Sequence, residues 1–121
     1  MASGRAAKVA EAIKEEVSDI LANKMKDPRL GFVSVVKVEV SRDLRHAKVG
    51  VSVLGDVDAK RNTLQALEQA VGFIRSELGR RLRLRHVPEL KFRLDESIEE
   101  GVRIARLLEE MRGKKAEETD G

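Results

Sequence analysis

Two segments of alternating apolar and polar residues, separated by only five residues, constrain the fold of this chain most. They read FVSVVKVEV (32–40) and HAKVGVSVL (46–54), and a repeat of two residues is typical of a half-buried β-strand. The short connection SRDLR (41–45) favours antiparallel neighbours, because parallel strands need a long crossover. The sequence therefore predicts an antiparallel β-hairpin, with Asp43 stabilising the turn through the local backbone. Its inward-facing residues are expected to be Val36, Val38 and Val40 in the first strand and Ala47, Val49, Val51 and Val53 in the second.

The segments around the hairpin predict helices and one further strand. Residues 5–24 and 59–83 carry apolar side chains every three to four positions, which is the spacing of one helix face. After Pro88, LKFRL (90–94) alternates again and predicts a third strand. With a last helix from residue 97, the order is α-β-β-α-kink-α-β-α. This order predicts a small α+β domain in which helices cover one face of a three-stranded sheet.

The end of the chain predicts a fourth helix and a tail. Ser97 stands three residues before Glu100, the spacing of a capping box at a helix start, and Gly113 is a natural C-cap. GKKAEETDG (113–121) has a single alanine as its apolar content, so we expect a disordered tail after one domain over residues 1–112. The apolar face of the helix is expected to comprise Ile98, Val102, Ala105, Leu108 and Met111.

Charge is distributed unevenly along the 121 residues, whose formal net charge is only +3. Residues 58–93 carry nine Lys and Arg against four Asp and Glu, whereas residues 94–121 carry five against nine. A basic segment of this kind is consistent with a binding surface for a polyanion, and equally with a solvated, arginine-rich face. Charge alone does not separate the two.

Several function classes lack the residues they need. The chain has no cysteine, so neither a disulfide framework nor a thiolate zinc site is expected. It contains no phosphate-binding loop, dinucleotide fingerprint or zinc-protease motif, which argues against an enzyme and against a cofactor or metal. No apolar run approaches the ~18 residues of a membrane span, and we expect a cytoplasmic protein. With three Phe and no Tyr or Trp, base stacking on a sheet face is also not expected.

A glycine, Gly72, interrupts the helical pattern of residues 59–83. Glycine in a helix interior destabilises the helix by about 1 kcal/mol relative to alanine, so a structural role for this glycine is expected. The element order is that of a type II KH domain, in which a G-x-x-G loop joins two central helices and clamps nucleic acid. Here the junction reads Ala70-Val71-Gly72. We expect a tight kink, with Gly72 adopting unusual dihedral angles or allowing close packing.

Four motifs in order make the chain similar to a known family. They are D-P-R-L in residues 26–31, S-x-D-L-x-x-A-K-V in the hairpin, G-F-I-R-S after the kink, and R-x-x-P-E-L-x-F entering the third strand. Together they resemble bacterial ribosome-binding factor A, a KH-like family in which an A-x-G kink replaces the G-x-x-G loop. The resemblance covers nearly all of the predicted domain. One departure is Gly50, at a position where the family commonly has an aromatic residue, and it is expected to weaken the second strand.

The resemblance implies a function. Proteins of this family bind the free small (30S) ribosomal subunit late in its assembly, near the decoding region. They assist maturation of 16S rRNA, notably processing at its 5′ end, and are needed especially in the cold. Release is helped in some bacteria by an assembly GTPase. For this chain the resemblance therefore implies the small subunit and its 16S rRNA as partners, and we expect a monomer.

A run of arginines supplies the expected contacts with ribosomal RNA: Arg75, Arg80, Arg81, Arg83 and Arg85. Arg75 should flank the buried helix face with part of its stem packed. Arg80 and Arg81 should face solvent, turned away from the apolar stripe. Two other functions stay open at this stage: a generic KH-like protein binding other RNA or DNA, and a protein-interaction module whose arginines only solvate the helix.

Overall fold

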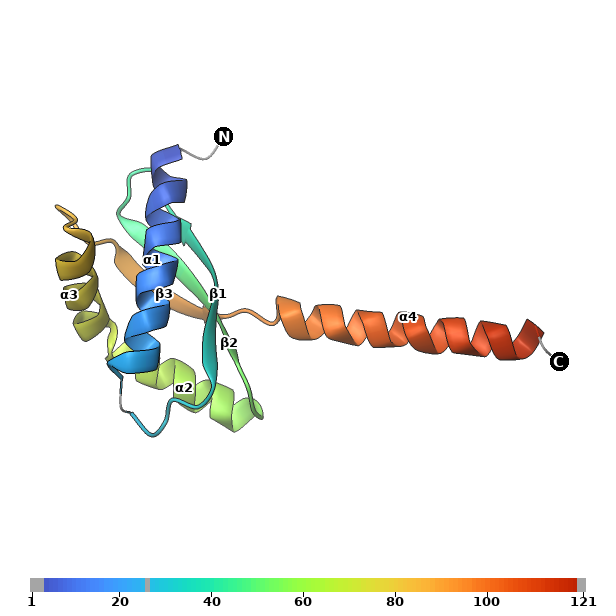
Figure 1. Cartoon of the computed structure of the whole chain (residues 1–121). Helices are drawn as coiled ribbons and strands as arrows, with labels where there is room; N and C mark the ends of the chain where they lie inside the picture. The colour runs from blue at the N-terminus through green and yellow to red at the C-terminus, as the bar shows by residue number, and fades with distance from the viewer. Residues whose placement is uncertain (1–3, 26, 120–121) are drawn as a thin grey trace.

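The computed structural model describes residues 4–25 and 27–119, which form seven elements in the order α1-β1-β2-α2-α3-β3-α4 (Figure 1). This arrangement confirms the predicted α+β fold class and the order of its elements. The bounds are α1 (Gly4–Asn23), β1 (Val33–Val40), β2 (His46–Val53), α2 (Val57–Gln69), α3 (Val71–Leu82), β3 (Glu89–Leu94) and α4 (Ser97–Thr119).

The three strands form one mixed sheet in the order β1-β2-β3. β1 and β2 pair antiparallel, which confirms the predicted hairpin, and β3 joins the other side of β2 in parallel. A β-bulge shifts the register between Val35 and Lys37. Because the extra residue exchanges the faces of the strand, Val35 is buried and Val36 only half-buried, contrary to the predicted face of this strand. The four inward residues predicted for β2 are all buried.

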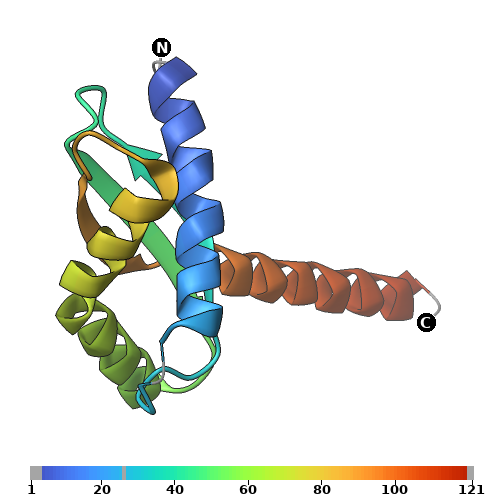
Figure 2. The ribbon, with the colours of Figure 1, turned by 60° about the vertical axis from the view of Figure 1, so that its left-hand side comes forward.

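The core lies between the sheet and the helices α1, α2 and α3, which cover one of its faces (Figure 2). Each element contributes apolar side chains that are hidden from solvent, and burying one of these stabilises the fold by about 1.5–3 kcal/mol. The opposite face of the sheet is left open: its side chains on β1, β2 and β3 are mostly exposed. The largest buried side chains of the core are Ile13, Val17, Ile20, Val49, Val51, Val53, Leu67, Ile74, Leu78 and Phe92.

The predicted long helix is divided into α2 and α3 at Ala70, whose φ of −92° and ψ of 2° are not helical. The backbone N–H of Ala70 donates hydrogen bonds to the carbonyls of Ala66 and Leu67, and the backbone N–H of Ile74 donates to the Ala70 carbonyl. Gly72 does not play the part predicted for it. Its φ is not positive, and among the described residues no atom outside the local backbone lies within 4 Å of a Cβ built on it. The break comes from Ala70, not from strain or crowding at Gly72.

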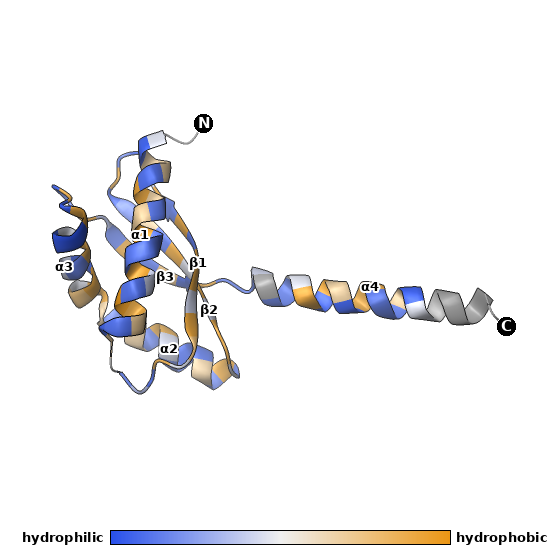
Figure 3. Ribbon diagram, in the orientation of Figure 1, coloured by the Kyte–Doolittle hydropathy of each residue, from blue (hydrophilic) through white to orange (hydrophobic). Residues whose placement is uncertain are grey.

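Helix α4 does not pack on the sheet as the predicted helical layer required, but projects away from the domain (Figures 1 and 2). Apolar residues follow one another along it in Figure 3, and Val102, Leu108 and Met111 are 49%, 60% and 66% exposed. The side chain of Ile98 lies outside the described residues.

The predicted start of α4 at residue 97 is confirmed, but the predicted caps at both ends of the helix are wrong. The helix begins at Ser97 itself, and the Asp95 carboxylate accepts the Ser97 amide at 2.9 Å, so the acceptor at this end is Asp95 and not a Ser97 capping box. It runs through Gly113 to Thr119, so Gly113 is not its C-cap. A disordered tail from residue 113 stays a prediction, and its last two residues, 120 and 121, lie outside the described part of the chain.

Candidate nucleic-acid interface

Arg75 ties α3 to the loop that enters β3. Its Nε donates to the Pro88 carbonyl at 3.0 Å and its Nη2 to the Val87 carbonyl at 2.8 Å. The residue is half-buried, in keeping with a stem packed beside the apolar face. Because these donors are occupied by the backbone, the first role of Arg75 is to position the loop.

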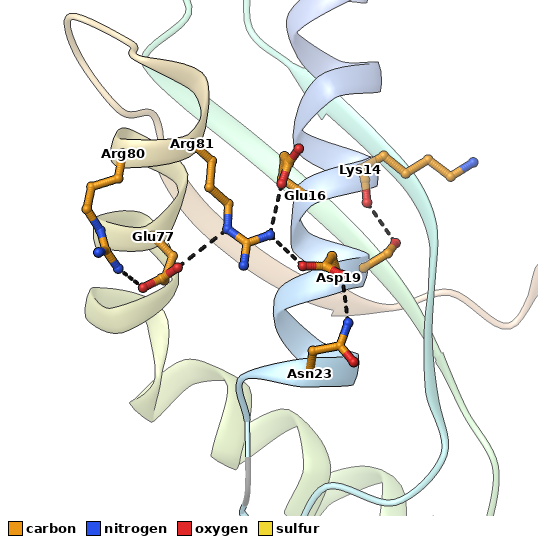
Figure 4. Close-up of polar contacts among 8 residues, drawn as sticks. Lys14, Glu16, Asp19, Asn23, Glu77, Arg80 and Arg81 are labelled. Atoms are coloured by element: carbon orange, nitrogen blue, oxygen red, sulfur yellow. Dashed lines mark hydrogen bonds and ion pairs between the residues drawn. The ribbon is translucent and has the colours of Figure 1, made fainter.

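Arg81 joins α3 to α1 (Figure 4). Its Nη1 lies 2.9 Å from Glu16 and 2.6 Å from Asp19, and its Nε lies 3.4 Å from Glu77. The side chain is only 21% exposed, so the prediction that Arg81 faces solvent is wrong. The reason is angular: three residues after Leu78 is a turn of about 300°, which places Arg81 only about 60° from the buried stripe, on the side that faces α1.

The carboxylates around Arg81 neutralise its charge. Its hydrogen bond to Asp19 is the main cause that holds the pKa of that carboxyl below its usual value, and the same bond raises the pKa of the guanidinium. An arginine held by three carboxylates has little charge to offer a phosphate.

Arg80 faces solvent, as predicted, with its side chain 73% exposed. It pairs with Glu77, a buried residue of α3 whose carboxylate lies between the side chains of Arg80 and Arg81 (Figure 4). The guanidinium of Arg80 is exposed, and Glu77 keeps Arg81 as a second partner at 3.4 Å. Arg80 can therefore leave Glu77 for another anion more easily than Arg81 can leave its three partners.

Arg83 and Arg85 stand beyond the end of α3, and both are exposed. Arg83 ends the helix in the left-handed region, with φ 50° and ψ 40°. Within the part of the chain that the structure describes, neither side chain has an ion-pair partner. Of the five predicted arginines, these two have the most available charge.

Arg85 lines a cleft of about 620 Å³ at the end of the molecule where β2 and β3 begin. We call it the basic cleft. Arg5 contributes from the start of α1, Arg45 from the hairpin turn, and Arg75 from α3. The remaining lining residues are Asp43, Leu44, His46, Leu84, His86, Val87 and Glu89. Both histidines of the chain, His46 and His86, therefore line the basic cleft.

The acidic groups of the basic cleft are used locally. Asp43 Oδ1 accepts from the Ser41 hydroxyl at 2.7 Å and from the Arg45 amide at 3.1 Å, which confirms its predicted role in the turn. The Ser41 hydrogen bond is the main cause that lowers the pKa of Asp43. Glu89 lies 3.6 Å from Nδ1 of His46. The arginines of the cleft therefore outnumber the carboxylates.

Sequence reasoning missed Arg5 and Arg45, because no local pattern relates them to Arg85. The only available signal was topological: a hairpin turn and the loop before a parallel third strand lie at the same end of a sheet. The assembled cleft can hold phosphates through guanidinium groups without reading bases.

Among the described residues no group of three or more His, Asp and Glu could hold a metal ion. None of the helices within those residues has the length and apolar character to cross a bilayer.

Comparison with known proteins shows extensive similarity. A family model described as ribosome-binding factor A matches residues 5–108. The ribosome-binding factor A of Heliobacterium modesticaldum is 60% identical over 111 residues, covering 92% of each chain. The crystal structure of ribosome-binding factor A from Thermus thermophilus superposes with a TM-score of 0.68 at 26% identity, covering 76% of this chain and 97% of that one.

A further similar structure is that of a complex. A homology model of the Thermus thermophilus ribosome-binding factor A, fitted into a cryo-electron microscopy map of its complex with 30S, matches with a TM-score of 0.58 at 29% identity. The match covers 78% of this chain and 94% of that one.

Proposed function

The chain belongs to the ribosome-binding factor A family, and on this premise we propose that it binds the free small (30S) ribosomal subunit. There it assists late maturation of 16S rRNA, including processing of the 5′ end, and its action matters most in the cold. The observation that carries the proposal is the 30S complex of the similar Thermus thermophilus factor. The protein acts in the cytoplasm as a monomeric binding factor and catalyses no reaction.

The available cations of the basic cleft supply the contacts with RNA in this proposal. Arg85 and Arg45 offer guanidinium groups from two loops, and Arg5 offers a third from the start of α1. Arg80 and Arg83 extend the same charge along the end of α3. Since the chain lacks Tyr and Trp, recognition relies on the shape and phosphates of folded RNA.

Arg75 and Arg81 have a different part in the proposal. Arg75 fixes the loop that carries Arg85, and Arg81 fixes α3 against α1. They position the surface that meets the RNA, while their own charges stay engaged within the protein. An assembly GTPase that promotes release is a further proposed partner.

Sedimentation tests the function directly. Tagged protein mixed with extract is expected to migrate with free small subunits on a sucrose gradient, and not with translating ribosomes. A strain without the protein should accumulate 16S rRNA with an unprocessed 5′ end, more so at low temperature, as measured by primer extension. Migration at the top of the gradient, or binding to short single-stranded RNA as tight as to subunits, would argue against the proposal.

A matched pair of variants tests the interface. Arg45→Gln with Arg85→Gln should weaken subunit binding and reduce its salt dependence, because each lost phosphate contact lowers the salt slope by about 1. Lys24→Gln with Arg61→Gln removes the same charge from exposed positions outside the cleft, and its affinity should stay near that of the wild type. Equal loss in both variants would place the interface elsewhere.

A further inference from the structure

Two loops of the basic cleft contain the same three residues in the same order. Leu44-Arg45-His46 spans the hairpin turn and the start of β2, and Leu84-Arg85-His86 follows the end of α3. We call them the two triplets, and all six of their residues line the cleft. In each triplet the leucine is half-buried, whereas the arginine and the histidine are exposed. The triplets thus bring apolar groups, guanidinium groups and imidazole rings together at one end of the molecule, beside the start of α1 (Figure 2).

Backbone hydrogen bonds hold the two loops in place beside each other. The Glu89 amide, at the end of the second loop, donates to the Arg45 carbonyl at 2.8 Å. Glu89 is also the strand partner of His46 in the parallel pairing of β2 with β3. Arg75 fixes the second loop by donating to two of its backbone carbonyls. The cleft is therefore preformed, which reduces the entropy that a ligand has to offset on binding.

The backbone is strained at both triplets. Leu44 has φ 62°, and Arg83, directly before the second triplet, has φ 50°. Among the described residues these are the two positive values of φ outside glycine. Glycine adopts this conformation without strain, and a bulky residue rarely does. Strained residues of this kind cluster at binding sites, and the Leu44 side chain lines the cleft.

The charge and the size of the cleft suit a nucleotide. Neither Arg45 nor Arg85 belongs to an ion pair within the described part of the chain. Among the lining residues four arginines stand against two carboxylates, Asp43 and Glu89. The volume of about 620 Å³ is that of a site for a small ligand, which is typically about 300–1,000 Å³.

The residues between the arginines suit the base of that nucleotide. Unpaired bases of RNA stack on the rings of histidine and on the planes of guanidinium groups. The cleft supplies His46 and His86 for this purpose. Leu44 and Leu84 add apolar surface, which a site for phosphates alone does not need.

We infer that the basic cleft receives one unpaired nucleotide of the folded RNA. Its base lies on the leucines and histidines of the two triplets, and its phosphates are bound by Arg45 and Arg85. The inference rests on the proposed function, since the RNA is that of the small subunit, and it adds one base contact to the phosphate contacts proposed above. A paired base is stacked inside a helix and does not reach the cleft, so the ligand is a bulged or looped nucleotide.

A small RNA tests the base contact. A short RNA duplex with a single bulged adenosine is compared with the same duplex fully paired, and binding is measured by fluorescence anisotropy. The wild-type protein should bind the bulged duplex roughly tenfold more tightly, which is the order of magnitude of one stacked base.

Two double variants separate the base contact from the phosphate contacts. Leu44→Asn with Leu84→Asn should abolish the preference for the bulge and leave the salt slope unchanged, and asparagine tolerates the left-handed backbone at position 44. Arg45→Gln with Arg85→Gln should weaken binding to both duplexes and lower the salt slope by up to about 2. A phosphate site without a base contact predicts no difference between the two duplexes for any of these proteins.

Matched controls exclude a general effect of the substitutions. Leu54→Asn with Leu107→Asn replaces two leucines at exposed positions outside the cleft, and it should keep the wild-type preference for the bulge. Circular dichroism checks that each variant folds. His86→Ala changes an exposed residue and should reduce the preference even if the leucine variant proves unstable.

Chemical probing extends the test to the subunit itself. Wild-type protein should protect an unpaired base of 16S rRNA from dimethyl sulfate, and the variant of Leu44 and Leu84 should leave that base reactive while it still binds. Identical protection by both proteins would overturn the inference.

The outcomes separate this inference from the function on which it rests. Wild-type protein that fails to bind small subunits contradicts the proposed function. Wild-type protein that binds subunits but does not distinguish the bulged duplex from the paired one overturns the nucleotide site alone. A preference for the bulge that persists in both the leucine variant and His86→Ala also overturns it, because the base would then lie elsewhere.

Discussion

Replacing Gly72 by alanine should stabilise the protein. The residue is the second of α3, is exposed, and has an ordinary negative φ. A methyl group added there meets no atom within 4 Å among the described residues, other than the local helix backbone. Alanine can therefore adopt the native conformation without strain, and it loses less backbone entropy on folding than glycine does.

The magnitude follows from the position. Glycine in a helix interior is about 1 kcal/mol worse than alanine, and compatible replacements of glycine by alanine gain about 0.4–1 kcal/mol. Since Gly72 lies in the first turn, where propensity counts less, we expect about 0.5 kcal/mol. For a domain of this size, 1 kcal/mol corresponds to roughly 4–8 °C, so the Tm should rise by about 2–4 °C.

Gly55 provides the matched comparison. Its φ is +138°, and a Cβ built on it lies 2.8 Å from the Ala59 Cβ. Gly55→Ala should therefore lower the Tm, and by more than Gly72→Ala raises it. Thermal unfolding followed by circular dichroism and by calorimetry measures both variants and checks that unfolding is two-state. A lower Tm for Gly72→Ala would refute the reasoning and restore a structural need for glycine at the kink.

Two further predictions concern Arg81 and α4. The hydrogen bond from Arg81 lowers the pKa of Asp19 below its ordinary value of 3.8. The ionised Asp19 carboxylate therefore stabilises the fold at pH values above 3.8. This contribution is lost as the pH falls through the lowered pKa of the folded state. Arg81→Gln should therefore be less stable than the wild type at pH 7, with a difference in urea midpoint that shrinks below about pH 4; a difference independent of pH would contradict this. Removing residues 97–121 should change the Tm by less than about 2 °C, because α4 contributes no side chain to the core. Thermal unfolding followed by circular dichroism measures this change. A fall in Tm of more than about 4 °C would show that α4 packs on the domain.

Periodicity made most of the domain predictable. Alternation in β2 and helical spacing in α1 and α3 report burial directly, because the sheet and each helix have one buried face. The bulge in β1 was not predictable in this way, because valine stands at both candidate positions, Val35 and Val36, and also at the other inward positions of the strand. When both neighbours are valine, the sequence does not show at which residue the strand changes face.

The behaviour of α4 shows a second limit of sequence reasoning. Its apolar residues have helical spacing, and the structure contains the helix, but spacing does not say what the helix packs against. The partner of an amphipathic face lies outside the segment that carries the pattern. The same limit applies to the glycines: nothing in the local sequence distinguishes Gly72, which has open space beside it, from Gly50, where a Cβ would lie 3.2 Å from the Asp95 side chain.

The arginines show why a basic stretch is not yet a binding surface. Arg81 and Arg85 are alike in sequence, but two of the carboxylates that engage Arg81 lie 62 and 65 residues away, on α1. Arg85 lines the basic cleft together with Arg5 and Arg45, which are also far from it in the chain. Whether a cation is structural or available to RNA is therefore decided by the tertiary fold. It follows that a variant of Arg81 loses subunit binding through displacement of α3, together with stability, whereas a variant of Arg85 loses binding alone.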